Sequence, residues 1–284
     1  MVRVVPASRP SEVPRMPRRP STGLVARAAA CLACSFLLLP LVAAAQGPDG
    51  QDVPAGGPTI DVPRRDYMVG RAHGSVAVRG TWLFAGAGSD IYDFVTEQLT
   101  LEKQAFNAPS LDIEADFALT PRLDVVGGFQ FSSTSKGSEY RHFEDNAGLP
   151  IEQTTSMKQF GIGASAKYAL VPRGRRVSRF AWVPRSVVPY VGAGAGLQKY
   201  ELVQQGDFVD AETLRVFSDT FRSEGWAPSA HAFGGVDVQA YRQLYVTAEA
   251  RYVWSSADLE ADFVGFDPID LSGFRCGAGI RLVF

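Results

Sequence analysis

Hydrophobic and polar residues alternate one by one over most of the chain beyond about residue 72. In 110–119, every odd-numbered position is apolar, whereas the even-numbered positions hold Asp112, Glu114 and Asp116. Successive side chains of a strand point to opposite faces, so this alternation predicts strands and not helices. Eight such segments occur, at 75–84, 110–119, 122–132, 159–170, 187–200, 229–241, 244–254 and 273–284.

The predicted strands are long. At roughly 10–14 residues they exceed the 5–6 residues usual in soluble sheets, and they match the 9–11 tilted residues with which a barrel strand crosses a bilayer. The pattern therefore predicts an all-β fold, an eight-stranded antiparallel transmembrane β-barrel within 71–284.

The connections between these strands are unequal in length and in charge. Two are tight turns, 120–122 and 241–243, while the others alternate with them and are long: 85–110, 135–156, 201–228 and 255–270. The long ones hold most of the acids. Short periplasmic turns and long extracellular loops are typical of outer-membrane barrels. The connection 171–187 breaks the rule, because it should be short but is long, with five arginines and no acid.

The first 45 residues have the features of an export signal. Six arginines precede an uncharged, largely apolar stretch, 28–45, which ends in a run of alanines before Gln46. We expect a signal peptide that is cleaved after Ala45, since signal peptidase recognises small residues there. Translation could start at Met1 or at Met16. The alternative is an uncleaved anchor helix.

Residues 46–70 are rich in Gly, Pro and Asp without an apolar period, so we expect a flexible linker. Without 1–45 the chain has 22 basic and 29 acidic residues, a net charge of −7. This balance gives no electrostatic basis for nucleic-acid binding. Only Cys276 remains, so an internal disulfide is not expected.

Aromatic residues on the apolar faces are expected in two bands. One band lies near the loop end and the other near the turn end, as in the aromatic girdles of membrane barrels. The first comprises Trp82, Phe84, Phe131, Phe160 and Trp254, and the second comprises Phe117, Tyr168 and Phe284.

The final strand, Gly279-Ile280-Arg281-Leu282-Val283-Phe284, has apolar residues alternating back from a terminal aromatic, with a glycine before them. With the strand and loop pattern, it makes 72–284 resemble the small outer-membrane β-barrel proteins of the OmpA-transmembrane-domain and OmpX type. The resemblance implies that the outer-membrane assembly machinery recognises Gly279, Ile280, Leu282 and Phe284. The chain stops at Phe284, so we expect no peptidoglycan-binding domain.

The faces opposite the aromatic ones are expected to line the lumen. They carry five bases and six acids: Arg79, Lys167, Arg251, Arg275 and Arg281 with Asp112, Glu114, Asp116, Asp124, Asp237 and Glu249. An eight-stranded barrel is just wide enough for side chains to fill, so such charges must be paired or wetted. We expect ion pairs among Arg79, Glu114, Lys167, Glu249, Arg251, Arg275 and Arg281, centred on Glu114, Glu249, Arg251 and Arg275.

These ion pairs allow two interpretations, a static network that fills the lumen or a gate in which Arg281, Arg275 or Lys167 changes partner. Signals for catalysis are weak. His73, His142 and His231 lie in contexts that suit solvated or lumen residues, and the acids of 255–270 have no EF-hand spacing. We therefore expect no catalytic residues, no metal and no cofactor.

The sequence thus predicts a non-enzymatic outer-membrane protein of a Gram-negative-type bacterium, with a structural or surface-interaction role and at most narrow passive permeation. Its expected partners are outer-membrane lipid, lipopolysaccharide and the assembly machinery, with no nucleic acid, and it is expected to be a monomer. The alternatives are a lipid-modifying hydrolase that uses His142 or His231, and a small-solute channel or transport protein.

Overall fold

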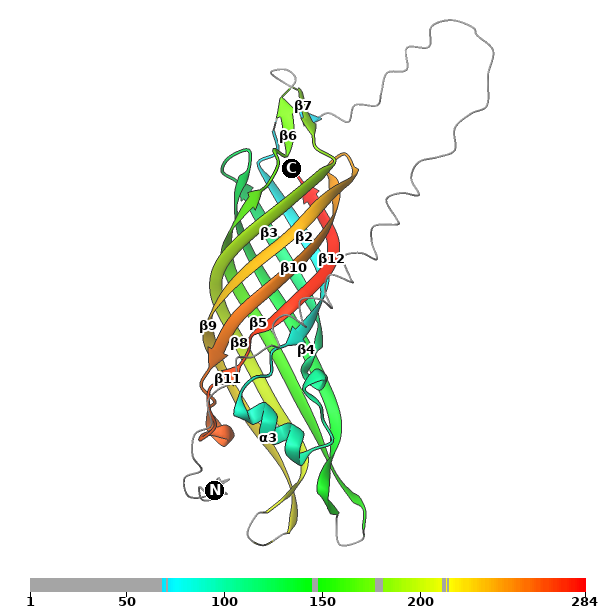
Figure 1. The fold of residues 1–284 in the computed structure, drawn as a ribbon, viewed down its shortest axis with the longest axis vertical. Coiled ribbons are helices and arrows are strands. Elements are labelled where there is room, and N and C mark those ends of the chain that lie inside the picture. Colours follow the sequence, from blue (N-terminus) through cyan, green and yellow to red (C-terminus); the bar gives the residue numbers. More distant parts are fainter. Residues whose placement is uncertain (1–67, 70, 145–147, 177–180, 211–212, 214) are drawn as a thin grey trace, which may run out of the picture. The chain divides into compact units, whose positions relative to one another are not determined.

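The computed structural model describes residues 68–69, 71–144, 148–176, 181–210, 213 and 215–284. Within them, eight long strands form one antiparallel ring (Figure 1). Each strand pairs with the next, and the last pairs with the first to close the ring. The expected eight-stranded antiparallel barrel is therefore confirmed. The strands are β2 (Gly74–Ala85), β3 (Ala108–Ala118), β4 (Leu123–Glu144), β5 (Pro150–Ala169), β8 (Val187–Val209), β9 (Val216–Tyr241), β10 (Leu244–Ala257) and β12 (Gly273–Val283).

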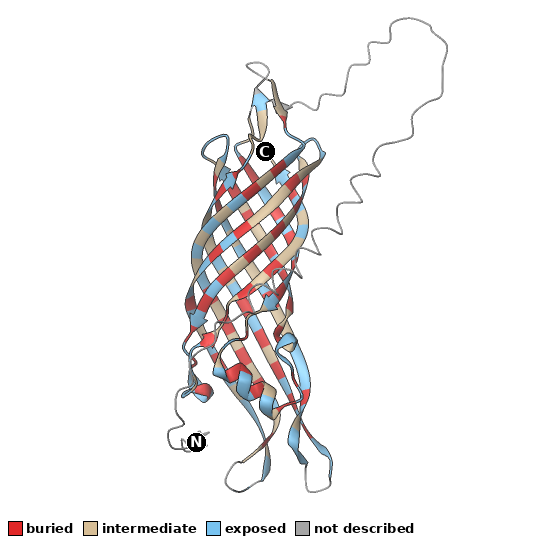
Figure 2. Cartoon of the chain, in the orientation of Figure 1, coloured by how far each residue is buried: buried red, intermediate tan, exposed pale blue. Residues whose placement is uncertain are grey.

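Burial alternates along these strands, as Figure 2 shows by its red and blue stripes. In β3 the residues at 108, 110, 112, 114 and 116 are buried, while those between them are more exposed. Large apolar side chains thus cover the outer wall, and charged side chains fill the inside. All eight aromatic residues expected outside are exposed, between 36% for Phe160 and 62% for Phe117.

Two tight turns join strands at one end of the barrel, which we call the turn end. Between β3 and β4 the backbone N–H of Leu119 donates to Leu123 O, and the Thr120 hydroxyl accepts from the N–H of Leu123 at 2.9 Å. Between β9 and β10, Arg242 has a φ of 31°. Both turns fall where the sequence predicts them.

The basic connection between β5 and β8 forms a second, small sheet at the turn end. Its strands β6 (Gly174–Arg176) and β7 (Ala181–Pro184) pair with each other, and β7 also pairs with β1 (Met68–Val69). The predicted flexible linker therefore ends in a paired strand, because extended backbone at 68–69 matches the free edge of β7. The predicted signal peptide, with Ala45 and Gln46, and the rest of the linker lie outside the described residues.

The connections at the opposite end, the loop end, are more ordered than predicted. Residues 135–156 and 201–228 were expected as loops, but they are mostly strand: β4 and β5 pair as far as Glu144 and Pro150, and β8 and β9 as far as Val209 and Val216. Most of their exposed residues are polar, as in a loop, yet inward positions such as Ile151 and Leu202 keep the period of two.

The other two long connections fold over the mouth of the barrel. Residues 85–110 contain α3 (Asp90–Gln98) and the 3₁₀ helix η1 (Lys103–Phe106), while 255–270 contain η2 (Ala261–Phe263) and β11 (Ile269–Asp270). Helix α3 begins after Ser89 with acids in its first turn, which the helix dipole favours. No helix in the described part of the chain is long and apolar enough to span a membrane.

Candidate functional site

Four charged side chains, here called the central cluster, meet inside the barrel. Arg79 Nη2 lies 2.6 Å from Glu114 Oε1 and 3.4 Å from Glu249 Oε1. Arg251 Nη2 lies 2.6 Å from Glu249 Oε1 and also pairs with Glu114. All four side chains are buried, and their charges sum to zero. Compensation of this kind is required where charges are removed from water.

A second group of four charges, here called the turn-side cluster, lies nearer the turn end. Lys167 Nζ donates to Asp116 Oδ2 at 3.0 Å, and Arg281 pairs with the same carboxylate. Arg281 Nε also lies 3.3 Å from Asp237 Oδ1. This cluster also has two bases and two acids, so its net charge is zero.

Arg275 does not join the central cluster, contrary to the sequence expectation. Its guanidinium instead donates to the amide oxygens of Gln130 and Gln159, the latter at 3.3 Å. Gln198 also donates to Gln159, at 2.9 Å. The place expected for Arg275 belongs to Arg79, since the pairing of β2 with β3 puts Arg79 beside the acids of β3. The other six residues expected in ion pairs all make them.

Tyr190 links the two clusters and was missed in the sequence. Its hydroxyl donates to Glu249 Oε2 at 3.0 Å, and its ring lies 4.0 Å from Lys167 Nζ. It comes from β8, which lies opposite β2 in the ring. The segment 187–191 is apolar on both faces, so alternation alone could not assign Tyr190 to the lumen.

Glycines on the inner wall make room for these large side chains. A Cβ on Gly192 would lie 2.2 Å from the Phe233 ring, and one on Gly235 would lie 2.6 Å from the Tyr190 hydroxyl. These inward glycines therefore lie against large side chains of the neighbouring strand, which packs the lumen closely.

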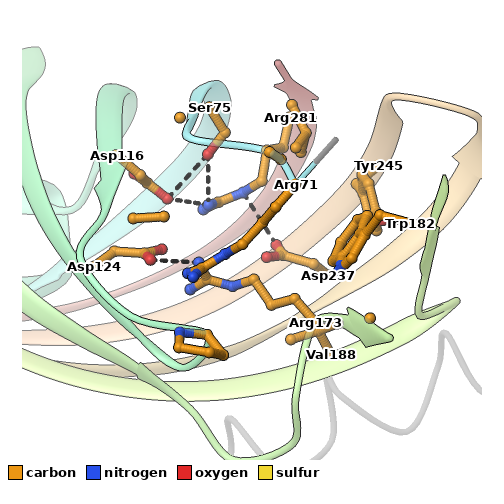
Figure 3. A pocket seen from close by; sticks show the side chains of 16 residues that line it. Arg71, Ser75, Asp116, Asp124, Arg173, Trp182, Val188, Asp237, Tyr245 and Arg281 are labelled. Carbon is orange, nitrogen blue, oxygen red and sulfur yellow. Dashed lines mark hydrogen bonds and ion pairs between the residues drawn. The ribbon is translucent and has the colours of Figure 1, made fainter. Parts of the chain in front are cut away.

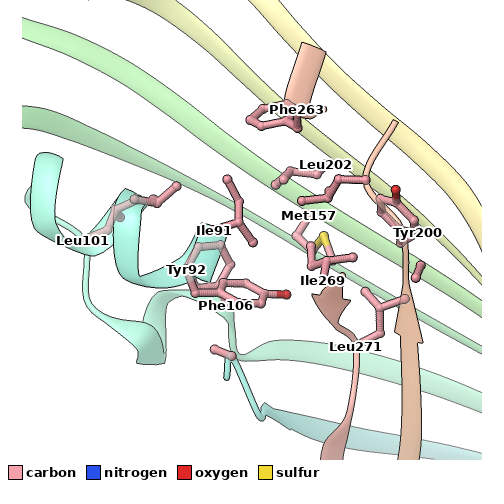
Figure 4. Packing of buried hydrophobic residues seen from close by; sticks show 14 of the residues in the cluster. Ile91, Tyr92, Leu101, Phe106, Met157, Tyr200, Leu202, Phe263, Ile269 and Leu271 are labelled. Carbon is pink, nitrogen blue, oxygen red and sulfur yellow. The ribbon is translucent and has the colours of Figure 1, made fainter. Parts of the chain in front are cut away.

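The loop end is closed by a hydrophobic cluster, here called the loop-end plug (Figure 4). Ile91, Tyr92 and Val95 of α3 pack with inward residues of β5 and β8, such as Met157 and Leu202. Further members are Ala87, Leu99, Leu101, Phe106, Tyr200, Ala227, Ala257, Leu259, Phe263, Ile269 and Leu271. An apolar layer thus separates the charged lumen from solvent at this end.

Tyr92 ties the plug to the last long connection. Its hydroxyl donates to the carbonyl of Asp270 at 3.1 Å, and its ring meets Phe106 edge to face at 4.7 Å. Burial, and to a lesser extent the negative charge of Asp270, raise the pKa of the Tyr92 hydroxyl well above its ordinary value. The plug therefore favours the neutral phenol.

The turn end contains a cavity of about 280 Å³, here called the turn-end cavity (Figure 3). Asp116, Asp237 and Arg281 of the turn-side cluster form its inner wall. The basic connection contributes Arg173, which pairs with Asp124 of β4, and Trp182 of β7. The sequence indicated that this connection is unusual, but it gave no register that would place Trp182 over the mouth.

The histidines do not form a catalytic arrangement among the described residues. His231 lies in the middle of β9, not at its start, and its Nε2 is 2.7 Å from the Ser165 hydroxyl. Both line a space of only about 30 Å³, the size of one water. His142 and His73 are exposed. No group of three metal-ligating side chains occurs in the part of the chain that the structure describes.

No protein-family model and no curated protein matches the chain. Solved structures do. Neisserial surface protein A (NspA) is 15% identical, with 75% of this chain and 96% of that chain covered and a TM-score of 0.41. The outer membrane protein OprG from Pseudomonas aeruginosa is 11% identical over 76% and 99%, with a TM-score of 0.43. Ail, the attachment invasion locus protein of Yersinia pestis, is 16% identical over 76% and 100%, with a TM-score of 0.34.

At these identities the comparison concerns the fold alone. These are proteins of the kind that the sequence pattern resembles, small barrels of the outer membrane. The eight-stranded antiparallel barrel itself is shown by the strand pairing of the chain.

Proposed function

We propose that the chain is a non-enzymatic integral protein of the outer membrane, whose barrel holds acidic loops at the cell surface and does not conduct solutes. The observation that carries this proposal is the inverted distribution of side chains. Ile162, Leu197 and Ile280 are more than half exposed on the outer wall, while eleven charged residues are buried inside. A soluble monomer rarely exposes so continuous an apolar surface, whereas lipid requires one.

The aromatic residues support a position for the bilayer. At the loop-end edge of the apolar wall Phe160 meets Trp226 at 6.4 Å, and Tyr252 meets Trp254 at 4.8 Å. Phe117, Tyr168 and Phe284 lie at the other edge. Amphipathic rings favour the two membrane interfaces, so the hydrocarbon layer would lie between these bands.

Charge supports the proposed orientation. Acids predominate in the connections of the loop end, and arginines in those of the turn end. With the rule of short periplasmic turns and long outer loops, the turn end would face the periplasm. Lipid and lipopolysaccharide would then contact the outer wall. Ile280, Leu282 and Phe284, all exposed on β12 or directly after it, would be presented to the assembly machinery.

Close packing argues for a closed lumen and against the channel alternative. The two charge clusters fill the interior, and the loop-end plug closes one mouth. This favours the static network over a gate, because the space that Glu114, Arg251 and His231 line is only about 30 Å³. That space is also too small for a lipid substrate, which argues against the hydrolase alternative.

Two measurements test the proposal. Cell fractionation should place the full chain in the outer membrane, and the folded barrel should migrate differently in gels before and after boiling. The purified protein in planar bilayers should give no resolvable conductance steps. A soluble product without heat-dependent migration contradicts the membrane proposal, while steady conductance contradicts only the closed lumen.

A further inference from the structure

The turn-end cavity is a pocket with two chemically different sides. Its lining has three arginines and three aspartates, so its net charge is zero, and between them lie apolar residues such as Ala118, Pro121 and Val188. About 280 Å³ corresponds to about nine water-sized groups. The cavity therefore suits a small molecule and is too small for a folded partner.

One side presents an acid next to aromatic rings. Asp237 is 5% exposed; its Oδ1 is ion-paired with Arg281 Nε at 3.3 Å but accepts no hydrogen bond among the described residues. The rings of Trp182 and Tyr245 lie beside it in Figure 3. A buried carboxylate flanked by aromatic faces attracts an ammonium group through charge and through cation–π contact.

The other side presents guanidinium groups. Arg71 donates to the Thr120 carbonyl and Arg173 pairs with Asp124, and both are directed into the cavity in Figure 3. Each guanidinium has five N–H donors, so these contacts leave donors for a ligand. Guanidinium groups bind carboxylates with two parallel hydrogen bonds.

The cover of the cavity is itself closely fitted. The Trp182 ring lies against the backbone of β6 at Gly174, where an added Cβ would be 2.3 Å from the ring. Any residue larger than glycine at position 174 would displace the Trp182 indole. The small sheet therefore holds an aromatic wall over the mouth of the barrel.

We infer that the turn-end cavity binds a small zwitterion of amino-acid size, with its ammonium group at Asp237, Trp182 and Tyr245 and its carboxylate at Arg71 and Arg173. A lone anion meets three aspartates, and a lone cation meets three arginines, so a ligand with both charges gains most. The inference rests on the barrel and its small sheet, and it does not depend on the membrane location.

Alanine is the probe, and acetate and ethylammonium are its two halves. Each is titrated calorimetrically into the full chain in detergent micelles. Alanine should bind saturably, with each half at least about tenfold weaker, since each lacks one of the two charge contacts. Asp237→Asn should weaken alanine binding about tenfold and leave acetate unchanged. Arg173→Gln, which lies outside the barrel strands, should weaken both alanine and acetate.

Arg122→Gln is the matched control, because Arg122 lies in the turn at the same end but does not line the cavity. It should bind alanine as the unaltered chain does. All variants are first checked for the gel shift of the folded barrel. The inference is overturned if alanine gives no saturable heat, which leaves a water-filled cavity, if acetate alone binds as tightly, or if alanine binds equally to folded Asp237→Asn and Arg173→Gln.

Discussion

Arg79 Nη2 and Glu114 Oε1 lie 2.6 Å apart on adjacent strands, and neither side chain is more than 3% exposed. Glu114 also pairs with Arg251, so a single carboxylate compensates part of two buried guanidinium charges. Glu249 pairs with the same two arginines, so each member of the central cluster contacts both opposite charges.

Glu114→Gln should destabilise the barrel by about 3–5 kcal/mol, because the amide leaves buried arginine charge without its counterion. The measurement is the urea concentration at the midpoint of unfolding, where unfolding is monitored by the fraction of protein that keeps the gel mobility of the folded barrel. Glu152→Gln, on the exposed face of β5, is the control and should change stability by less than about 0.5 kcal/mol. Equal midpoints for the two variants would show that the central cluster does not contribute.

Gly192→Ala should destabilise the barrel by about 1–3 kcal/mol, because its Cβ would overlap the Phe233 ring and force it to move. Gly127→Ala is a matched change on the outer wall, where a Cβ would meet nothing within 4 Å. That variant should be neutral or slightly more stable. Thermal unfolding of both proteins in one detergent checks the difference, and a loss only for Gly127→Ala contradicts the packing described.

The loop-end plug should weaken at high pH. An unfolded tyrosine loses its proton near about pH 10, whereas the raised pKa of Tyr92 keeps the folded phenol neutral there. The contribution of Tyr92 to stability is therefore present in full below about pH 10. It is lost as the pH rises from there toward the pKa that Tyr92 has in the folded protein. Hydrogen exchange of α3 at about pH 8 and about pH 11 measures this effect.

Tyr92→Phe should remove this part of the pH dependence, and should cost about 1 kcal/mol at neutral pH through the lost hydrogen bond to Asp270. Tyr241→Phe, at the exposed turn end, is the control for removal of a hydroxyl. If α3 in Tyr92→Phe loses protection at high pH as strongly as in the unaltered chain, the phenol is not responsible.

Ile162→Lys tests whether lipid covers the outer wall. Ile162 is 53% exposed on β5, between the aromatic residues Phe160 and Tyr168. A lysine there should cost up to about 2–4 kcal/mol in a bilayer, but little if the position faces water. Thr154→Lys, exposed on the same strand beyond the aromatic bands, should cost less than about 0.5 kcal/mol. Refolding yields in lipid vesicles distinguish the two outcomes.

Alternation was sufficient to predict the barrel and the charged residues of its lumen. All eleven charged residues assigned to the inner face are buried, because in a paired strand the side-chain direction is fixed by odd or even position. The partners within the lumen were harder to predict. Arg79, and not Arg275, pairs with Glu114 and Glu249, because alternation fixes the face on which a residue lies but not which residues meet across the barrel.

The ends of the barrel were predicted least well. The polar residues of 135–156 and 201–228 suggest loops, although these segments form long hairpins. The plug combines α3 with residues more than 150 positions away, such as Ile269 and Leu271. Such packing between distant connections leaves no short-range pattern. The contact between Gly174 and Trp182 likewise forms only when β6 and β7 are paired.

The pairing of β2 with β12 has a consequence for the order of events in folding. Ala85 pairs with Gly273 and Ser75 with Val283, so the residues that close the ring are about two hundred positions apart in the chain. Such distant contacts carry a high entropic cost and form late. Until they form, both outermost strands have unpaired backbone edges that can pair with other chains. The protein is therefore most prone to aggregation before the ring closes. A chaperone that covers a strand edge would protect the chain during that interval.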